Sequence, residues 1–217
     1  MARTLLAKDV AIICDFDGTI IIEDMGELAL KRFAVGDYEH YDQLLIDGKI
    51  SLKECIETQY GMILSNEEEM LHHLMPHTQM REGFPEFAAK VASLGIEMTV
   101  VSAGIEFVIK RVLARDPRTS WIPIIAPKLW CEKGALHADA GIIDGQGHGE
   151  FKAAKVAEQK ALGREVIYIG DGLSDVNGSK EADLIFAVEA KRLARTCASS
   201  GRCTTFTDFF EIIQYIL

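Results

Sequence analysis

The sequence lacks several features that would place it in other classes of protein. It contains no run of eighteen apolar residues, which a transmembrane helix would need. Residues Met1–Asp9 lack the long apolar stretch of a secretory signal peptide. Basic residues are outnumbered, with 23 Lys and Arg against 33 Asp and Glu and a net charge of −10. We therefore expect a cytoplasmic protein whose partners include neither nucleic acid nor a membrane.

Cysteine is scarce, and no two cysteines have the C-x-x-C spacing. The five are scattered over the chain: Cys14, Cys55, Cys131, Cys197 and Cys203. Their spacing suggests neither a zinc knuckle nor a disulfide framework. What the chain does have is a 48% share of hydrophobic residues among 217, enough to bury a sizeable core. This length suits one α/β domain with a small insert.

Strand-like apolar runs recur along the chain, and helical patterns separate several of them. The runs are Val10–Cys14, Ile96–Ser102, Ile122–Ala126, Val166–Gly170 and Leu184–Val188. The clearest helical patterns are Glu86–Leu94, Ile105–Ala114, Lys152–Leu162 and Asp175–Glu181. Strands that alternate with helices predict an α/β fold with a Rossmann-like, doubly wound, mostly parallel sheet.

Two segments break this rhythm. Residues 23–78 show helical patterns throughout, at Met25–Phe33, Tyr38–Asp47, Leu52–Tyr60 and Asn66–Leu74. They predict a helical domain inserted after the first strand, with residues 1–22 and 79–217 forming the core domain. The second segment, Lys133–Gly149, is rich in turn residues and is interpreted as a β-hairpin or a pair of short strands. The basic run Lys191–Arg195 is interpreted as a solvated helix face.

Four polar signals fall at or just after predicted strand ends, or open a helix. In chain order they are Asp15–Thr19, Ser102, Lys152 and Gly170–Asp175. Ligands of open α/β sheets bind outside the carboxyl ends of the strands. If these strands are neighbours in one parallel sheet, all four signals converge on the same edge.

The residue types at these positions fit phosphoryl chemistry. Asp15, Asp17 and Asp171 can supply the oxygen ligands that Mg²⁺ prefers. Ser102, Lys152 and loop N–H groups can neutralise the oxygens of a phosphoryl group. One carboxylate can attack phosphorus while a second acid protonates the leaving oxygen. The spacing of Asp15 and Asp17 suits these two tasks.

The order of the four signals resembles the haloacid dehalogenase superfamily of phosphatases. That resemblance implies that Asp15 is the nucleophile and Asp17 the acid/base. It implies that the Asp15 carboxylate, the Asp17 backbone carbonyl and Asp171 hold Mg²⁺. Asp175 would orient Lys152 or a metal-bound water. Lys155, one turn on, is the alternative to Lys152; we prefer Lys152 because it opens the helix.

The resemblance also suggests substrate contacts, because the helical insert falls where this superfamily carries its cap. The candidates for substrate binding are Gly18, Thr19, Asp24, Ala103 and Gly104. The candidates expected to face inward from the cap are Asp24, Met25, Glu27, Lys49, Gln59 and Met62. The predicted partner is a small phosphorylated metabolite.

Within the superfamily the sequence resembles the phosphoserine phosphatase-like group. The stretches Arg81–Phe84 and Val100–Gly104 look most like the 2-hydroxy-3-keto-5-methylthiopentenyl-1-phosphate phosphatases. Phosphoserine phosphatases place an arginine for the substrate carboxylate in the cap, where this chain has Gln59. A phosphoserine phosphatase, a phosphotransferase or mutase, and a non-catalytic binding module remain alternatives. The oligomeric state, monomer or homodimer, stays open.

Overall fold

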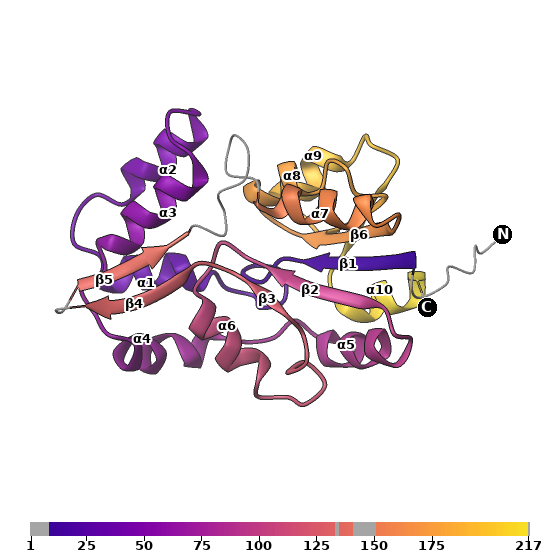
Figure 1. Ribbon diagram of the computed structural model, residues 1–217, viewed down its shortest axis with the longest axis horizontal. Helices are drawn as coiled ribbons and strands as arrows, with labels where there is room; N and C mark the ends of the chain where they lie inside the picture. The colour runs from indigo at the N-terminus through magenta and orange to yellow at the C-terminus, as the bar shows by residue number, and fades with distance from the viewer. Residues whose placement is uncertain (1–8, 133–134, 141–150, 217) are drawn as a thin grey trace.

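A six-stranded parallel sheet forms the centre of the protein (Figure 1). The computed structural model describes residues 9–132, 135–140 and 151–216. The strands are β1 (Val10–Cys14), β2 (Glu97–Val101), β3 (Ile124–Ile125), β6 (Glu165–Gly170), β7 (Leu184–Val188) and β8 (Cys203–Phe206). Their order, β3-β2-β1-β6-β7-β8, runs outward from β1 in both directions. The predicted doubly wound sheet is confirmed.

Helices cover both faces of this sheet. Figure 1 shows α7 (Phe151–Ala161), α8 (Leu173–Gly178) and α9 (Arg192–Cys197) on one side of β1 and β6, and α5 (Phe84–Ser93), α6 (Glu106–Leu113) and α10 (Phe209–Ile216) on the other. All five residues of β1 are buried, as expected for a strand covered on both faces. Rings of Phe84, Phe87 and Phe206 pack around Phe209, with centroids 5.0–5.3 Å apart. These contacts hold α10 against the core.

Four α-helices lie between β1 and α5, as the helical patterns predicted. They are α1 (Met25–Phe33), α2 (Glu39–Ile46), α3 (Leu52–Gly61) and α4 (Glu67–Leu74), followed by the short 3-10 helix η2 (Met75–His77). Asp24, Ser51 and Asn66 accept N-cap hydrogen bonds at the starts of α1, α3 and α4. The division into a core domain and a cap domain stays a prediction.

The chain enters and leaves this helical segment side by side. The Ile22 N–H donates to the Gln79 carbonyl at 3.0 Å, and the Arg81 N–H donates to the Ile20 carbonyl at 2.7 Å. An antiparallel bridge joins Ile21 and Met80 between them. The two connections therefore form one short two-stranded hinge.

The predicted hairpin is present but begins earlier in the chain. β4 (Lys128–Glu132) pairs antiparallel with β5 (Ala135–Asp139). The pattern over Lys133–Gly149 placed both strands later, and residues 141–150 lie outside the described residues. The correction has a physical reason, since β4 is mostly exposed and lacks a strong apolar pattern. The Ala140 N–H donates to Glu57 at 3.2 Å, which ties the hairpin to α3.

Two further features differ from the sequence expectations. β8 and α10 were not predicted, because Cys203–Phe206 is short and only partly buried and α10 is only eight residues long. A disulfide joins Cys197 to Cys203, with the two Cα atoms 5.7 Å apart. The pairing arises because α9 ends next to the start of β8, which cysteine spacing alone did not reveal. None of the helices in the described ranges has the length and apolar character needed to cross a membrane.

Candidate active site

The carboxyl ends of β1 and β6 bring three acidic side chains together. The Asp15 N–H donates to the Ile169 carbonyl at 2.9 Å, which extends the pairing of the two strands. Asp15 directly follows β1, and Asp171 directly follows β6. Carboxylate oxygens of Asp15, Asp171 and Asp175 all lie within 4.8 Å of one another. The predicted convergence of the strand-end signals is therefore what the structure shows.

Lys152 supplies the buried positive charge of this cluster. Its Nζ lies 2.7 Å from Asp15 Oδ1 and 2.7 Å from Asp175 Oδ1, and its side chain is 2% exposed. Burial alone would lower the pKa of Lys152, but the two carboxylates raise it above its ordinary value. Lys155 instead pairs with Glu158 at 2.8 Å. The structure thus places Lys152, rather than Lys155, beside Asp15.

Asp175 is wholly buried behind Lys152. Its carboxylate accepts hydrogen bonds from the Tyr168 hydroxyl at 2.7 Å and from the N–H groups of Asp171 and Gly172 at 3.0 and 2.8 Å. Burial favours the neutral form, yet Lys152 and these donors hold the pKa of Asp175 below its ordinary value. This geometry suits the predicted role of orienting Lys152.

Asp17 faces the loop that follows β2. Its Oδ1 accepts a hydrogen bond from the Met25 N–H at 2.9 Å, at the start of α1. A Cβ atom at Gly104 would lie 2.1 Å from Asp17 Oδ2. The Gly104 N–H donates to Ser102 Oγ at 3.0 Å. Burial, reinforced by Asp24, raises the pKa of Asp17 well above its usual range.

Gly18 allows the Asp15–Thr19 loop to meet the end of β6. Its φ is +73°, and a Cβ atom there would lie 2.3 Å from Asp171 Oδ2. Both observations require glycine at this position. Thr19 is fully buried, and its hydroxyl has no hydrogen-bond partner among the described residues.

A cavity of about 1040 Å³ opens above this cluster. The predicted site residues that line it are Asp15, Asp17, Gly18, Asp24, Glu27, Gln59, Ser102, Ala103, Gly104, Lys152 and Asp171. Thr19, Met25, Lys49, Met62 and Asp175 are not among the lining residues. The reasons are local, since Met25 is buried in the core and Lys49 pairs with Asp47 at 2.9 Å on the outside of α2. Thr19 and Asp175 lie behind the residues that face the cavity.

The side of the cavity formed by α1–α3 is largely apolar. Its apolar lining includes Leu45, Ile46, Leu52, Ile56 and Tyr60. The Tyr60 hydroxyl donates to the Ala103 carbonyl at 3.3 Å, a contact between α3 and the loop after β2. Gln59 is buried, and its amide donates to Asp42 at 2.7 Å and to the Tyr38 carbonyl at 3.0 Å.

Sequence reasoning missed two cations at the mouth of the cavity. Lys191 and Arg192 line it, and Lys191 Nζ lies 3.7 Å from Asp171 Oδ2. The run containing them was interpreted as a solvated helix face. A signal was available, because Lys191 follows β7, whose carboxyl end lies at the same sheet edge as that of β6.

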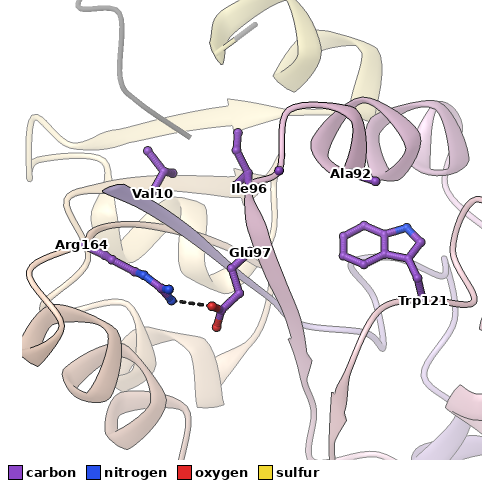
Figure 2. Close-up of a pocket in the computed structure, with 7 residues that line it drawn as sticks. Val10, Ala92, Ile96, Glu97, Trp121 and Arg164 are labelled. Carbon is purple, nitrogen blue, oxygen red and sulfur yellow. Dashed lines mark hydrogen bonds and ion pairs between the residues drawn. The ribbon is translucent and has the colours of Figure 1, made fainter. Parts of the chain in front are cut away.

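A second pocket, of about 370 Å³, lies at the opposite edge of the sheet (Figure 2). Figure 2 shows Arg164 reaching Glu97, so the charged side chains drawn there are paired with each other. Val10 and Glu97 lie at the amino ends of β1 and β2. This pocket is therefore remote from the acidic cluster.

Fold and site together define an α/β protein with a doubly wound parallel sheet and a buried acidic cluster at the carboxyl ends of β1 and β6. A family model described as haloacid dehalogenase-like hydrolase matches residues 12–180. The chain belongs to this family, which confirms the resemblance drawn from the four motifs.

Individual relatives agree with this assignment. The chain is 27% identical over 223 residues to the 2-hydroxy-3-keto-5-methylthiopentenyl-1-phosphate phosphatase of Bacillus velezensis, covering 98% of this chain and 89% of that protein. It is 27% identical over 221 residues to the protein of the same name from Geobacillus kaustophilus, covering 96% of each. A substrate-bound phosphoserine phosphatase structure superposes with a TM-score of 0.72 at 18% identity, covering 96% of this chain and 98% of that one. The last comparison supports the fold alone.

Gly104→Ala is expected to reduce kcat for the hydrolysis of a phosphate ester about 100-fold, because the methyl group of the alanine would displace the Asp17 carboxylate. The backbone at Gly104 has no positive φ, so thermal stability should change little. Gly61→Ala, where an added Cβ meets nothing within 4 Å, is the matched control and should keep full activity. Steady-state kinetics and thermal melting of both variants check this. A wild-type kcat for Gly104→Ala would contradict the arrangement.

Proposed function

We propose that the protein is a phosphomonoesterase that forms an aspartyl-phosphate on Asp15. The observation that carries this proposal is the state of the Asp15 carboxylate. Its Oδ1 is held by Lys152 at 2.7 Å, while no donor within the described part of the chain is hydrogen-bonded to Oδ2. Asp15 lines the cavity, so this second oxygen is available to a bound phosphate ester.

The proposed reaction has two steps. An Asp15 oxygen attacks phosphorus, and the bond from phosphorus to the ester oxygen breaks as Asp17 protonates that oxygen. Asp17 then accepts a proton from a water molecule, which attacks phosphorus, releases inorganic phosphate and restores the Asp15 carboxylate. Lys152, Ser102 and backbone N–H groups bind the phosphoryl oxygens.

The donor set fits the predicted Mg²⁺. We propose the Asp15 carboxylate, the Asp17 carbonyl and Asp171 as its ligands, because Mg²⁺ takes oxygen donors. No hydrogen-bond donor in the described ranges is assigned to the Asp17 carbonyl. Burial and the nearby Asp175 raise the pKa of Asp171 to about 6, which reflects the cost of crowding carboxylates in a buried site. Bound Mg²⁺ would supply positive charge to the phosphoryl oxygens.

The cavity supports a substrate with an uncharged, partly apolar carbon chain. Of the described lining residues contributed by α1–α3, Lys31 is the one cation, and it pairs with Glu27 at 2.6 Å. On this side of the cavity a substrate carboxylate would therefore lack a fork of donors, and the cations Lys191 and Arg192 line the cavity from the core instead. We propose 2-hydroxy-3-keto-5-methylthiopentenyl-1-phosphate or a related ester as substrate, in line with the names of the relatives. Phosphoserine is the weaker candidate.

We further propose that residues 23–78 act as a cap over a core of residues 1–22 and 79–217. The bond from Tyr60 to Ala103 and that from Met25 to Asp17 support this arrangement, since each joins the helical segment to a catalytic loop. Such a cap would contact substrate and exclude water. Composition supports a cytoplasmic enzyme with a small metabolite as partner.

Phosphate release from three esters, with Mg²⁺ and with chelator, tests the proposed function. We expect Mg²⁺-dependent release, with kcat/KM for the methylthiopentenyl ester on the order of 100-fold above that for phosphoserine, since an unpaired carboxylate is costly to bury. A generic aryl phosphate serves as the reference. Equal kcat/KM values for the methylthiopentenyl ester and phosphoserine would contradict the substrate proposal. Transfer of the phosphoryl group to a sugar hydroxyl without release of free phosphate would favour a phosphotransferase. A protein that neither hydrolyses an ester nor binds Mg²⁺ would favour a binding module.

A further inference from the structure

Arg81 lies in the two-stranded hinge formed by residues 20–22 and 79–81, and its side chain hydrogen-bonds to the backbone of the Asp15–Thr19 loop. Its Nε donates to the Thr19 carbonyl at 2.8 Å, and its Nη2 donates to the Gly18 carbonyl at 2.7 Å. Its Nη1 donates to the Thr207 carbonyl at 3.1 Å, after β8. One guanidinium therefore joins the loop to the hinge and to the C-terminal segment.

The loop has backbone carbonyls that need such a partner. Residues 16–21 form a tight turn in which the Phe16 carbonyl accepts from Thr19, Ile20 and Ile21 at 3.2, 2.8 and 3.1 Å. Within this turn only the Phe16 carbonyl accepts hydrogen bonds from the turn's own N–H groups, so the later carbonyls need other donors. The Arg81 side chain takes those of Gly18 and Thr19, and its backbone N–H takes that of Ile20 at 2.7 Å. The Asp17 carbonyl accepts no hydrogen bond from the described residues.

The geometry points to Arg81 as a positioning residue for catalysis. We propose that its rigid fork of donors fixes the Gly18 and Thr19 peptides, and thereby directs the Asp17 carbonyl and side chain toward the cavity. The position of the Gly18 backbone is tightly restricted, because Asp171 Oδ2 lies 2.3 Å from where a Cβ atom would stand. This inference rests on the proposed function for its kinetic consequence.

Arg81 is itself held firmly. Gly83, two residues on, has φ +79°, and a Cβ atom there would lie 2.8 Å from the Phe210 backbone nitrogen. The Phe209 N–H donates to the Glu82 carbonyl at 2.8 Å. The Arg81 guanidinium also lies 5.9 Å from the centre of the Phe206 ring. Contacts with the core therefore fix Arg81, and its hydrogen bonds fix the Asp15–Thr19 loop relative to the core.

Arg81→Lys is the test variant, because lysine keeps the charge but cannot hold both carbonyls as a fork. We expect kcat to fall about 10- to 100-fold, with little change in KM for the ester, and the Mg²⁺ dissociation constant measured by calorimetry to rise about tenfold. Arg81→Ala should show larger losses of both. Thermal melting and circular dichroism establish that each variant is folded. If Arg81→Ala does not fold, the kinetics and Mg²⁺ affinity of Arg81→Lys alone decide the proposal.

Arg115→Lys is the matched control. Arg115 donates to Thr78 Oγ1 at 2.7 Å and to the Met75 carbonyl at 3.2 Å, so it holds the same connecting segment without touching the loop. It should keep wild-type kcat and Mg²⁺ affinity. Equal losses in both lysine variants, or none in Arg81→Lys, would overturn the positioning role. If the wild-type protein released no phosphate, the proposed function would fail, and the Mg²⁺ titration would still decide the role of Arg81.

Discussion

Asp15→Asn should lower the rate of phosphate release by roughly 10⁴-fold or more, because an amide cannot form the acyl-phosphate. The same change should leave the protein folded with an equal or higher melting temperature. Burial, together with Asp175, raises the pKa of Asp15 well above its usual range despite Lys152, so a neutral amide should be tolerated at this position. Phosphate release and thermal melting measure the two effects.

The control for this prediction is Asp47→Asn. Asp47 is an exposed residue at the C-cap of α2, and its carboxylate pairs with Lys49. It lies outside the cavity lining and should retain full turnover. An Asp15→Asn variant that hydrolyses esters at more than trace rates would remove Asp15 from the role of nucleophile.

Lys152→Met should cost about 3–5 kcal/mol of the free energy of unfolding, besides a large loss of activity. The substitution keeps an unbranched side chain but removes the positive charge between Asp15 and Asp175. Two buried carboxylates would then face each other without a cation. Urea unfolding of the metal-free protein near neutral pH measures the change.

Lys155→Met provides the comparison, one helical turn further along α7. Its partner Glu158 has a side chain that is 58% exposed, so the pair contributes less than about 1 kcal/mol. Activity should be unchanged. Similar stability losses in the two variants would show that Lys152 is not the residue that neutralises the cluster.

The centre of the site was predictable from sequence because it depends on local patterns. Val10–Cys14 is a buried strand with the bounds the apolar run predicted, and Asp15 follows it at once. In a parallel sheet the ends of neighbouring strands share one edge, so Asp15 and Asp171 had to approach each other once β1 and β6 were neighbours. The four helices of residues 23–78 followed from their periodicity and caps.

Other features depend on tertiary contacts that local patterns do not encode. Lys152 was preferred to Lys155 because it opens the helix, but the contacts that distinguish the two, with Asp15 and with Glu158, are tertiary and local respectively. Arg81 is 62 residues from Thr19 in the chain, and the sequence around it does not predict the contact. Lys191 follows the predicted strand β7, but its place at the cavity depends on β7 lying beside β6. The β4–β5 hairpin was displaced because its first strand is largely exposed.

The formation of a phosphoryl group on Asp15 is the most direct test of the whole account. The protein would be mixed with its ester and Mg²⁺, quenched in acid within one turnover, digested and analysed by peptide mass spectrometry. We predict a transient phosphoryl group on the Asp15 side chain that decays as inorganic phosphate appears. Release of phosphate while Asp15 stays unmodified at every time point, or a phosphoryl group on another residue, would contradict the account.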